Sequence, residues 1–247
     1  MRSIKFLASA LLIGGVSAVS SAQSNIVGDA LFIADNGRTV TFSGNSFSGG
    51  ESSFYGSFGY YHPLSSDLVI KVGGAFASRS TTVRGLVATE TGGTDVEVKG
   101  IWYKGNWYAA VGASLPNTPA QTKAAGTFQV GVRSINDNGS AALSLVGVTS
   151  KDVSLMGVAA GVRIPLSGDI WIDGSATAMV RGGNTVDPST GAIDRVLVFN
   201  IGARYELGDG NAFFIGLGNK LGDTTGFSLT PRLGGGSGLQ FGAEVRF

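Results

Sequence analysis

LQFGAEVRF, residues 239–247, alternates between two kinds of side chain along its whole length. Apolar residues stand at every second position from Leu239 to Phe247, with glutamine, glycine, glutamate and arginine between them. Successive side chains of a β-strand point to opposite faces of the sheet, so a period of two predicts a strand with one apolar and one polar face. This stretch is therefore predicted to be a strand that separates two different environments.

Similar segments of about ten residues follow one another from about residue 38 onward. In one of them Asp95, Glu97 and Lys99 alternate with Val96 and Val98. A strand of about ten residues crosses a bilayer when it is tilted by about 45°, whereas strands of globular proteins average about five or six residues. The polar faces are also rich in small residues, which leave room inside a closed barrel and permit strong curvature. We therefore predict an all-β, transmembrane, antiparallel up-and-down β-barrel in preference to a soluble sandwich.

Twelve strands are predicted, an even number that places both ends of the barrel sequence on the same side. Ten or fourteen strands are the alternatives. The first predicted strand has few apolar residues, and the chain could instead turn a small hairpin at Asn36-Gly37 with residues 30–33. A further strand could lie within residues 220–237, around Phe227. The predicted strands cover residues 38–48, 52–62, 68–79, 94–104, 107–115, 125–135, 140–149, 153–164, 169–180, 194–206, 211–219 and 238–247.

The connections between these strands are short on one side of the predicted barrel and longer on the other. Two of the short turns, residues 61–67 and 163–169, are near-copies of each other, and residues 204–210 are a looser third version. Residues 104–106 and 136–139 are two further tight turns, with the Gly and Asn residues that such turns prefer. The connections on the other side are mostly longer and cover residues 79–93, 116–124, 181–193 and 220–237, with a shorter one at Ser150-Lys151. Short turns on the periplasmic side and longer loops on the outer side are typical of outer-membrane barrels.

The composition of the chain excludes several classes of function. With no cysteine among its 247 residues, the chain has no disulfide framework and no thiolate metal site. A formal net charge of +1 gives no basic footprint for nucleic acid, so no nucleic-acid partner is expected. The 40 glycines are more than twice the average share of roughly 7%, which suits the strands and turns of a barrel. No cofactor and no metal site are predicted.

Residues 1–22 have the order of parts of a secretory signal peptide. Arg2 and Lys5 precede an apolar stretch that is too short to span a bilayer, and the small residues Ser20 and Ala22 form a cleavage site. The chain is therefore predicted to belong to an exported protein. Its three predicted parts are a signal peptide over residues 1–22, an N-terminal periplasmic segment over residues 23–37 and an outer-membrane barrel over residues 38–247.

The alternation that ends in Phe247 resembles the C-terminal insertion signal of bacterial outer-membrane β-barrel proteins, the porin-like barrels among them. The resemblance covers the architecture from about residue 38 to Phe247. It implies a protein of the outer membrane of a Gram-negative bacterium, surrounded by outer-membrane lipid and lipopolysaccharide. It also implies insertion by the outer-membrane barrel assembly machinery through the C-terminal strand.

Aromatic side chains are predicted to form a belt at the periplasmic membrane interface. They share the lipid-facing parity near predicted periplasmic strand ends, where amphipathic rings favour the interface. Trp171 breaks this pattern because it falls on the lumen-facing parity. The predicted interface residues are Tyr60, Trp102, Trp107, Tyr205 and Phe247.

Charged side chains are predicted on the opposite, lumen-facing parity of the strands. In a water-filled pore, facing basic and acidic side chains would set a transverse field that tunes which solutes pass. In a narrow barrel, the same charges would pair across the lumen as a structural network. The sequence leaves both alternatives open because it does not give the register of the strands. The predicted lumen-lining residues are Lys71, Asp95, Glu97, Lys99, Arg133, Arg163, Asp173, Arg204, Glu206, Glu244 and Arg246.

No catalytic residues are predicted, and the protein is not expected to be an enzyme. Known outer-membrane enzymes largely depend on a histidine near the outer surface as general base. The single histidine, His62, lies beside Pro63 in a predicted periplasmic turn, and no serine stands in a Gly-x-Ser-x-Gly turn. We predict a passive pore or narrow channel for small solutes. A structural or adhesive barrel with a closed lumen is the alternative.

Overall fold

The computed structural model describes residues 25–34, 37–47, 53–77, 93–117, 123–151, 154–187, 189–208, 210–231 and 236–247. The predicted signal peptide over residues 1–22 and nearly all of the predicted loop over residues 79–93 lie outside the described residues. The barrel strands are β1 (Thr39–Phe47), β2 (Ser53–Ser65), β3 (Leu68–Ala77), β4 (Thr94–Lys104), β5 (Trp107–Asn117), β6 (Ala125–Asn136), β7 (Gly139–Thr149), β8 (Ser154–Ser167), β9 (Ile170–Arg181), β12 (Val198–Gly208), β13 (Asn211–Gly218) and β14 (Gly238–Arg246).

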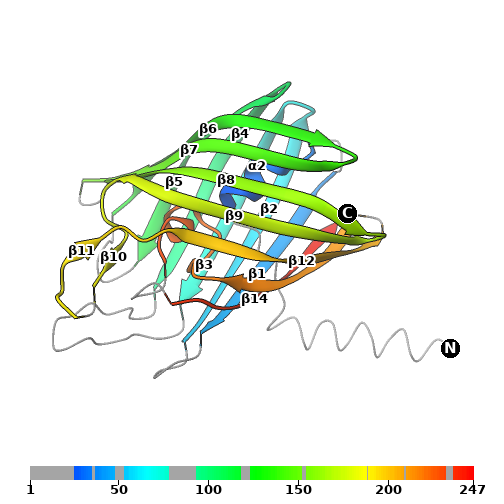
Figure 1. Ribbon diagram of the computed structural model, residues 1–247. Helices are drawn as coiled ribbons and strands as arrows, with labels where there is room; N and C mark the ends of the chain where they lie inside the picture. The colour runs from blue at the N-terminus through cyan, green and yellow to red at the C-terminus, as the bar shows by residue number, and fades with distance from the viewer. Residues whose placement is uncertain are drawn as a thin grey trace, which may run out of the picture.

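These strands form a closed antiparallel barrel, which runs in the order β1-β14-β13-β12-β9-β8-β7-β6-β5-β4-β3-β2 (Figure 1). The prediction of a twelve-strand, all-β barrel is confirmed for the described part of the chain. β1, the least certain strand in the sequence, closes the barrel, because Val40 pairs with Val245 of β14 on one side and with Tyr60 of β2 on the other. The alternatives of ten and fourteen strands are therefore wrong.

The two faces of the barrel differ as the alternation of the sequence predicts. On β4, the side chains of Val96 and Val98 are 46% and 49% exposed, whereas Asp95 and Glu97 are only 2% and 1% exposed. A soluble β-protein places its apolar residues inside, but here large apolar side chains cover the outside and polar ones face the interior. The barrel therefore has an apolar outer surface and a polar interior.

Tight turns join neighbouring strands at one end of the barrel. Between β4 and β5, Lys104 pairs with Trp107, so the turn itself consists of Gly105 and Asn106. Gly105 has a φ of +58°, in the left-handed region that a two-residue hairpin turn requires and that glycine adopts without strain. The backbone N–H of Phe247 donates to the carbonyl of Arg38 at 3.1 Å, so the two ends of the barrel sequence also meet.

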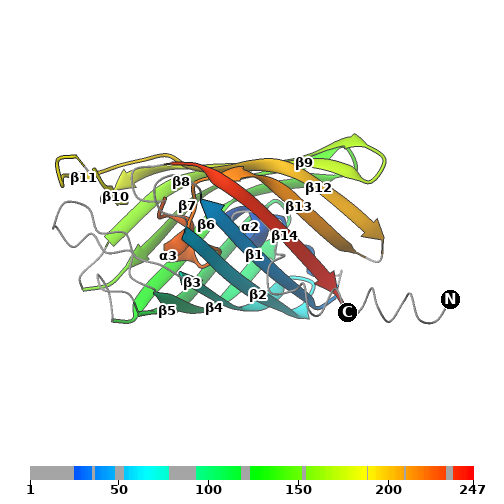
Figure 2. The same ribbon diagram turned by 90° about the horizontal axis from the view of Figure 1, so that it is seen from below.

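Two segments outside the barrel strands fold into the interior. The helix α2 (Asn25–Leu31) precedes β1, and the short helix α3 (Thr225–Ser228) lies in the connection between β13 and β14. Figure 2 shows both helices enclosed by the strands. A separate two-stranded sheet, β10 (Thr185–Val186) with β11 (Ile193–Asp194), lies in the connection between β9 and β12. No helix of the described residues is long and apolar enough to cross a membrane.

These inner segments correct three expectations from the sequence. Residues 23–37 were expected to lie in the periplasm, but α2 lies inside the barrel, where the carboxylate of Asp29 is fully buried. Residues 30 and 31 form the end of α2, and residues 32 and 33 follow it outside any strand, so they do not form a strand of a small hairpin. Phe227 lies in a helical turn, and not in a further strand within residues 220–237. The physical reason is the same for both segments: each provides charged or apolar partners for the side chains of the barrel wall that point into the interior.

Candidate functional site

The interior of the barrel is the candidate functional site, and its centre is the carboxylate of Asp29 on α2. The Lys71 ammonium lies 2.9 Å from Asp29 Oδ1, and the Lys99 ammonium lies 2.7 Å from Asp29 Oδ2. The Tyr61 hydroxyl donates a further hydrogen bond to Asp29 Oδ1 at 2.8 Å. These donors come from β3, β4 and β2, and each side chain is no more than 3% exposed. Neighbouring strands of the wall therefore hold one carboxylate from three directions.

The two lysines set the protonation of this site. Burial alone would raise the pKa of Asp29, but the ammonium groups of Lys71 and Lys99 outweigh it and hold the pKa below its usual value. An opposite charge within about 4–6 Å favours the ionised form of a carboxyl group, and both lysines lie within that range. Asp29 is therefore an ionised carboxylate at neutral pH.

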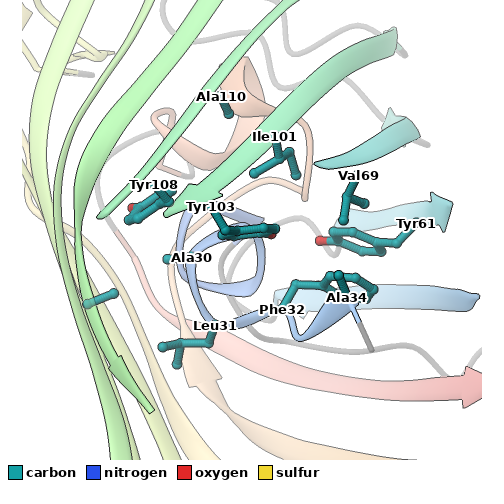
Figure 3. Close-up of a cluster of buried hydrophobic side chains, with 11 residues drawn as sticks. Ala30, Leu31, Phe32, Ala34, Tyr61, Val69, Ile101, Tyr103, Tyr108 and Ala110 are labelled. Atoms are coloured by element: carbon teal, nitrogen blue, oxygen red, sulfur yellow. The ribbon is translucent and has the colours of Figure 1, made fainter. Parts of the chain in front are cut away.

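The backbone of α2 is also bound to the wall at its C-terminal end. The Tyr103 hydroxyl donates to the carbonyl of Asp29 at 2.7 Å, and the guanidinium of Arg133 donates to the carbonyl of Phe32 at 2.7 Å. The ring of Phe32 stacks on that of Tyr61, with centroids 4.5 Å apart. Figure 3 shows Tyr61 and Tyr103 pointing from the strands toward the helix. Carbonyl groups at the end of a helix lack partners within it, and here the wall supplies them.

The second inner segment, residues 219–231, is connected to the wall next to the same site. The backbone N–H of Thr225 donates to Glu97 Oε2 at 3.0 Å, and the Thr225 hydroxyl donates to Glu97 as well. The Lys99 ammonium, which binds Asp29, also donates to the Thr225 hydroxyl at 2.9 Å. Lys99 therefore contacts both inner segments.

Further polar contacts fix the beginning of the same segment. Lys220 Nζ lies 2.5 Å from Asp223 Oδ1, and burial lowers the pKa of Lys220 although Asp223 acts in the opposite direction. The Ser57 hydroxyl of β2 donates to Asp223 Oδ2 at 3.1 Å, and the side-chain amide of Asn45 of β1 donates to the Lys220 carbonyl at 2.9 Å. This part of the segment is therefore tied to two strands.

The end of the segment is held by apolar contact. Leu229 is fully buried, and the carbonyl of the same residue accepts a hydrogen bond from the Asn184 side chain at 2.9 Å. Burying a leucine side chain contributes about 1.5–3 kcal/mol. The wall residues that pack around Leu229 are Ala125, Val146, Val148 and Ala159.

The other charges of the interior pair along the wall. Arg163 of β8 binds Asp173 of the neighbouring strand β9 through two hydrogen bonds, of 2.8 and 3.0 Å. Arg204 of β12 lies 2.9 Å from Glu244 of β14, and Arg246 lies 3.0 Å from the same carboxylate. This second group of charges does not need either inner segment for its partners.

A cavity of about 60 Å³ remains between α2 and this second group of charges. Sites for small organic molecules are usually about 300–1,000 Å³, so the cavity has room for water molecules but not for a solute of that size. Its lining residues are Gly28, Leu31, Phe32, Ile33, Thr39, Thr41, Tyr61, Lys71, Arg163, Asp223, Glu244 and Arg246.

The structure places the residues of the predicted lumen-lining set on the interior wall with different degrees of burial. Lys71, Asp95, Glu97, Lys99, Asp173 and Arg204 are at most 3% exposed. Arg133, Arg163, Glu206, Glu244 and Arg246 are partly buried. The predicted set lacks the residues that the inner segments contribute, above all Asp29, Lys220, Asp223 and Thr225.

The predicted interface aromatics lie on the outer surface. Trp102, Trp107, Tyr205 and Phe247 are 48%, 64%, 47% and 69% exposed. Tyr60 is partly buried because it stacks on Phe247, with ring centroids 6.5 Å apart.

Comparison with known proteins gives a likeness of fold alone. No family model and no curated protein matches this chain. Among solved structures, a KdgM porin superposes with a TM-score of 0.55 at 10% sequence identity, over 85% of this chain and 99% of that one. A structure titled "Bacterial polysaccharide outer membrane secretin" matches with a TM-score of 0.42 at 12% identity, over 86% of this chain and 99% of that one. The chain therefore has a porin-like barrel fold.

Proposed function

We propose that the protein is an outer-membrane barrel that forms a pore or narrow channel for small solutes. The observation that carries this proposal is the arrangement of its two faces. Large apolar side chains such as Val98 and Val111 are exposed outside, and charged ones such as Lys71 and Asp173 face the interior. Such a closed barrel is stable with lipid outside and water or polar groups inside. The likeness to a KdgM porin supports the same function at the level of fold.

The remaining parts of the proposal follow from this location. A signal peptide over residues 1–22 directs export, and the strand that ends in Phe247 engages the barrel assembly machinery. Trp102 and Trp107 lie in the lipid interface, where amphipathic rings are favoured. Outer-membrane lipid and lipopolysaccharide are its surroundings, and the protein catalyses no reaction.

Single-channel recording tests the proposal. The protein without residues 1–22 is refolded into detergent micelles and added to a planar lipid bilayer. Correct refolding is checked first by gel mobility, because a folded barrel migrates differently before and after heating. We expect discrete conductance steps from the folded sample and none from the same sample after boiling. If the folded sample shows no conductance under any recording condition, the proposed pore function is refuted.

A second candidate function is a structural or adhesive barrel with a closed lumen. The specific observation in its favour is that α2 and residues 219–231 occupy the interior. Silence of the wild-type protein and of variants designed to release α2 would favour this second function. Conductance of the wild-type protein would exclude it.

A further inference from the structure

Lys71 and Lys99 are directly opposite each other on neighbouring strands β3 and β4. Like charges in this position repel each other, and both side chains are almost completely buried. Glu97 lies 3.2 Å from Lys99 and balances one of the two charges, so a second anion is needed between the two ammonium groups. Asp29 supplies it, with one carboxylate oxygen 2.9 Å from Lys71 and the other 2.7 Å from Lys99. The wall therefore contains a built site for a carboxylate, and Tyr61 donates the third hydrogen bond.

The carboxylate in this site belongs to a segment that is not part of the wall. α2 and the residue after it are bound to the wall through Asp29, through carbonyl groups, and through the buried apolar side chains of Ala30, Leu31 and Phe32, which cluster with apolar and aromatic residues of the wall. Beside the helix, the cavity separates Leu31 and Phe32 from Arg163 and Arg246 of the second charge group. Among the described residues, the Asp29 carboxylate makes the salt bridges that join α2 to the wall, one to Lys71 and one to Lys99.

We propose that Lys71, Lys99 and Tyr61 form a carboxylate-binding site for which Asp29 is a tethered ligand, so that α2 acts as a latch on the lumen. With Asp29 in the site, α2 stays inside the barrel and obstructs the interior. When Asp29 leaves, α2 is released, and the two lysines take a carboxylate from solution in its place. This inference rests on the proposed pore function.

Recordings of the full chain with Asp29→Asn test the latch. Asparagine keeps the size of the side chain but removes the charge that balances the two lysines. We expect the open fraction to rise about tenfold, since a charge-assisted hydrogen bond is roughly twice as strong as a neutral one. Asp187→Asn is the control, because it removes a carboxylate that lies in the connection between β9 and β12, outside the barrel. Its open fraction should equal that of the wild type.

Acetate tests the binding site without any variant. Replacing sodium chloride by sodium acetate at equal ionic strength offers a free carboxylate that competes with Asp29 for the two lysines. We expect acetate to raise the open fraction of the wild type and to leave that of Asp29→Asn unchanged. This measurement stands even where the variant fails to insert.

The outcomes separate the latch from the pore. Equal open fractions for the wild type and Asp29→Asn, with both conducting, overturn the latch and leave the pore in place. Equal open fractions in acetate and chloride overturn the carboxylate site. Silence of the folded wild type, of Asp29→Asn and of Asp29→Lys overturns the pore itself, because Asp29→Lys places a third positive charge against Lys71 and Lys99 and expels α2.

Discussion

Replacing Gly112 by alanine tests how closely two strands approach each other beside the Asp29 site. Gly112 of β5 pairs with Lys99 of β4. A Cβ atom at this position would lie 2.8 Å from the Cα of Lys99 and would overlap the carbonyl oxygen of Val98. Both are backbone atoms, which cannot turn away as a flexible side chain can. The two strands must therefore move apart to admit one methyl group.

The magnitude follows from two opposing effects. Overpacking of a closely packed interior costs about 1–3 kcal/mol, while replacing a strand glycine by alanine otherwise gains roughly 0.5–1 kcal/mol. We expect Gly112→Ala to lower the free energy of unfolding by about 1–2 kcal/mol. The displacement of Lys99 also moves its ammonium group away from Asp29, so the open fraction should rise.

Urea unfolding in lipid vesicles, followed by tryptophan fluorescence, measures the free energy of unfolding. Single-channel recording measures the open fraction. Gly73→Ala on β3 is the matched control, because its Cβ would lie in ordinary contact, 3.4 Å from the Phe58 carbonyl oxygen. The control should raise the free energy of unfolding by roughly 0.5–1 kcal/mol, because it has the gain of the glycine replacement without the overpacking. If both variants are equally stable, the strands yield without cost and the reasoning from close approach is refuted.

Three further predictions concern the latch, the second inner segment and the outer surface. Because the pKa of Asp29 is lowered, the contribution of Asp29 to holding α2 is complete above the usual aspartate pKa of about 3.9 and is lost as the pH falls through the lower folded pKa. Recordings should therefore show a constant open fraction from about pH 5 to 8 and opening only below about pH 4. Opening near pH 6 would contradict this prediction. The Cβ atoms of Ala75→Cys and Gly222→Cys would lie 3.1 Å apart, so a small outward shift brings them into the range of about 3.5–4.5 Å that a disulfide spans. This disulfide should leave the conductance unchanged because residues 219–231 stay in place. A current that falls on oxidation and recovers on reduction would show that they move. Trp102 and Trp107, each kept as the single tryptophan, should be quenched by brominated lipid, and fluorescence that lipid bromine does not affect would place them outside the bilayer.

The strands could be predicted because each carries its own signal. Alternation specifies a strand and its two faces within about ten residues, and the tight turn at Gly105 even fixes the register of its hairpin. Once Lys104 is known to pair with Trp107, counting back along both strands pairs Lys99 with Gly112. The strands of the barrel wall can thus be predicted from local sequence patterns, without knowledge of distant residues.

The pairing of Lys71 with Lys99 could not be predicted in the same way. β3 and β4 are joined by the long connection between Ala77 and Thr94, which imposes no register. A slip of two residues would keep every side chain on its own face and would place Lys71 opposite Glu97, a favourable pair. The local pattern is equally compatible with both registers, so the site for a carboxylate becomes visible only in three dimensions.

The charges of the predicted lumen nevertheless contain a signal for the missing carboxylate. Six of its eleven residues are basic and five are acidic, so the wall alone has an uncompensated cation. Water can solvate that cation in an open lumen, but a closed interior requires an anion beside it. In the folded structure Asp29 supplies that anion, so the excess of one cation in the predicted set indicates a carboxylate outside the strands.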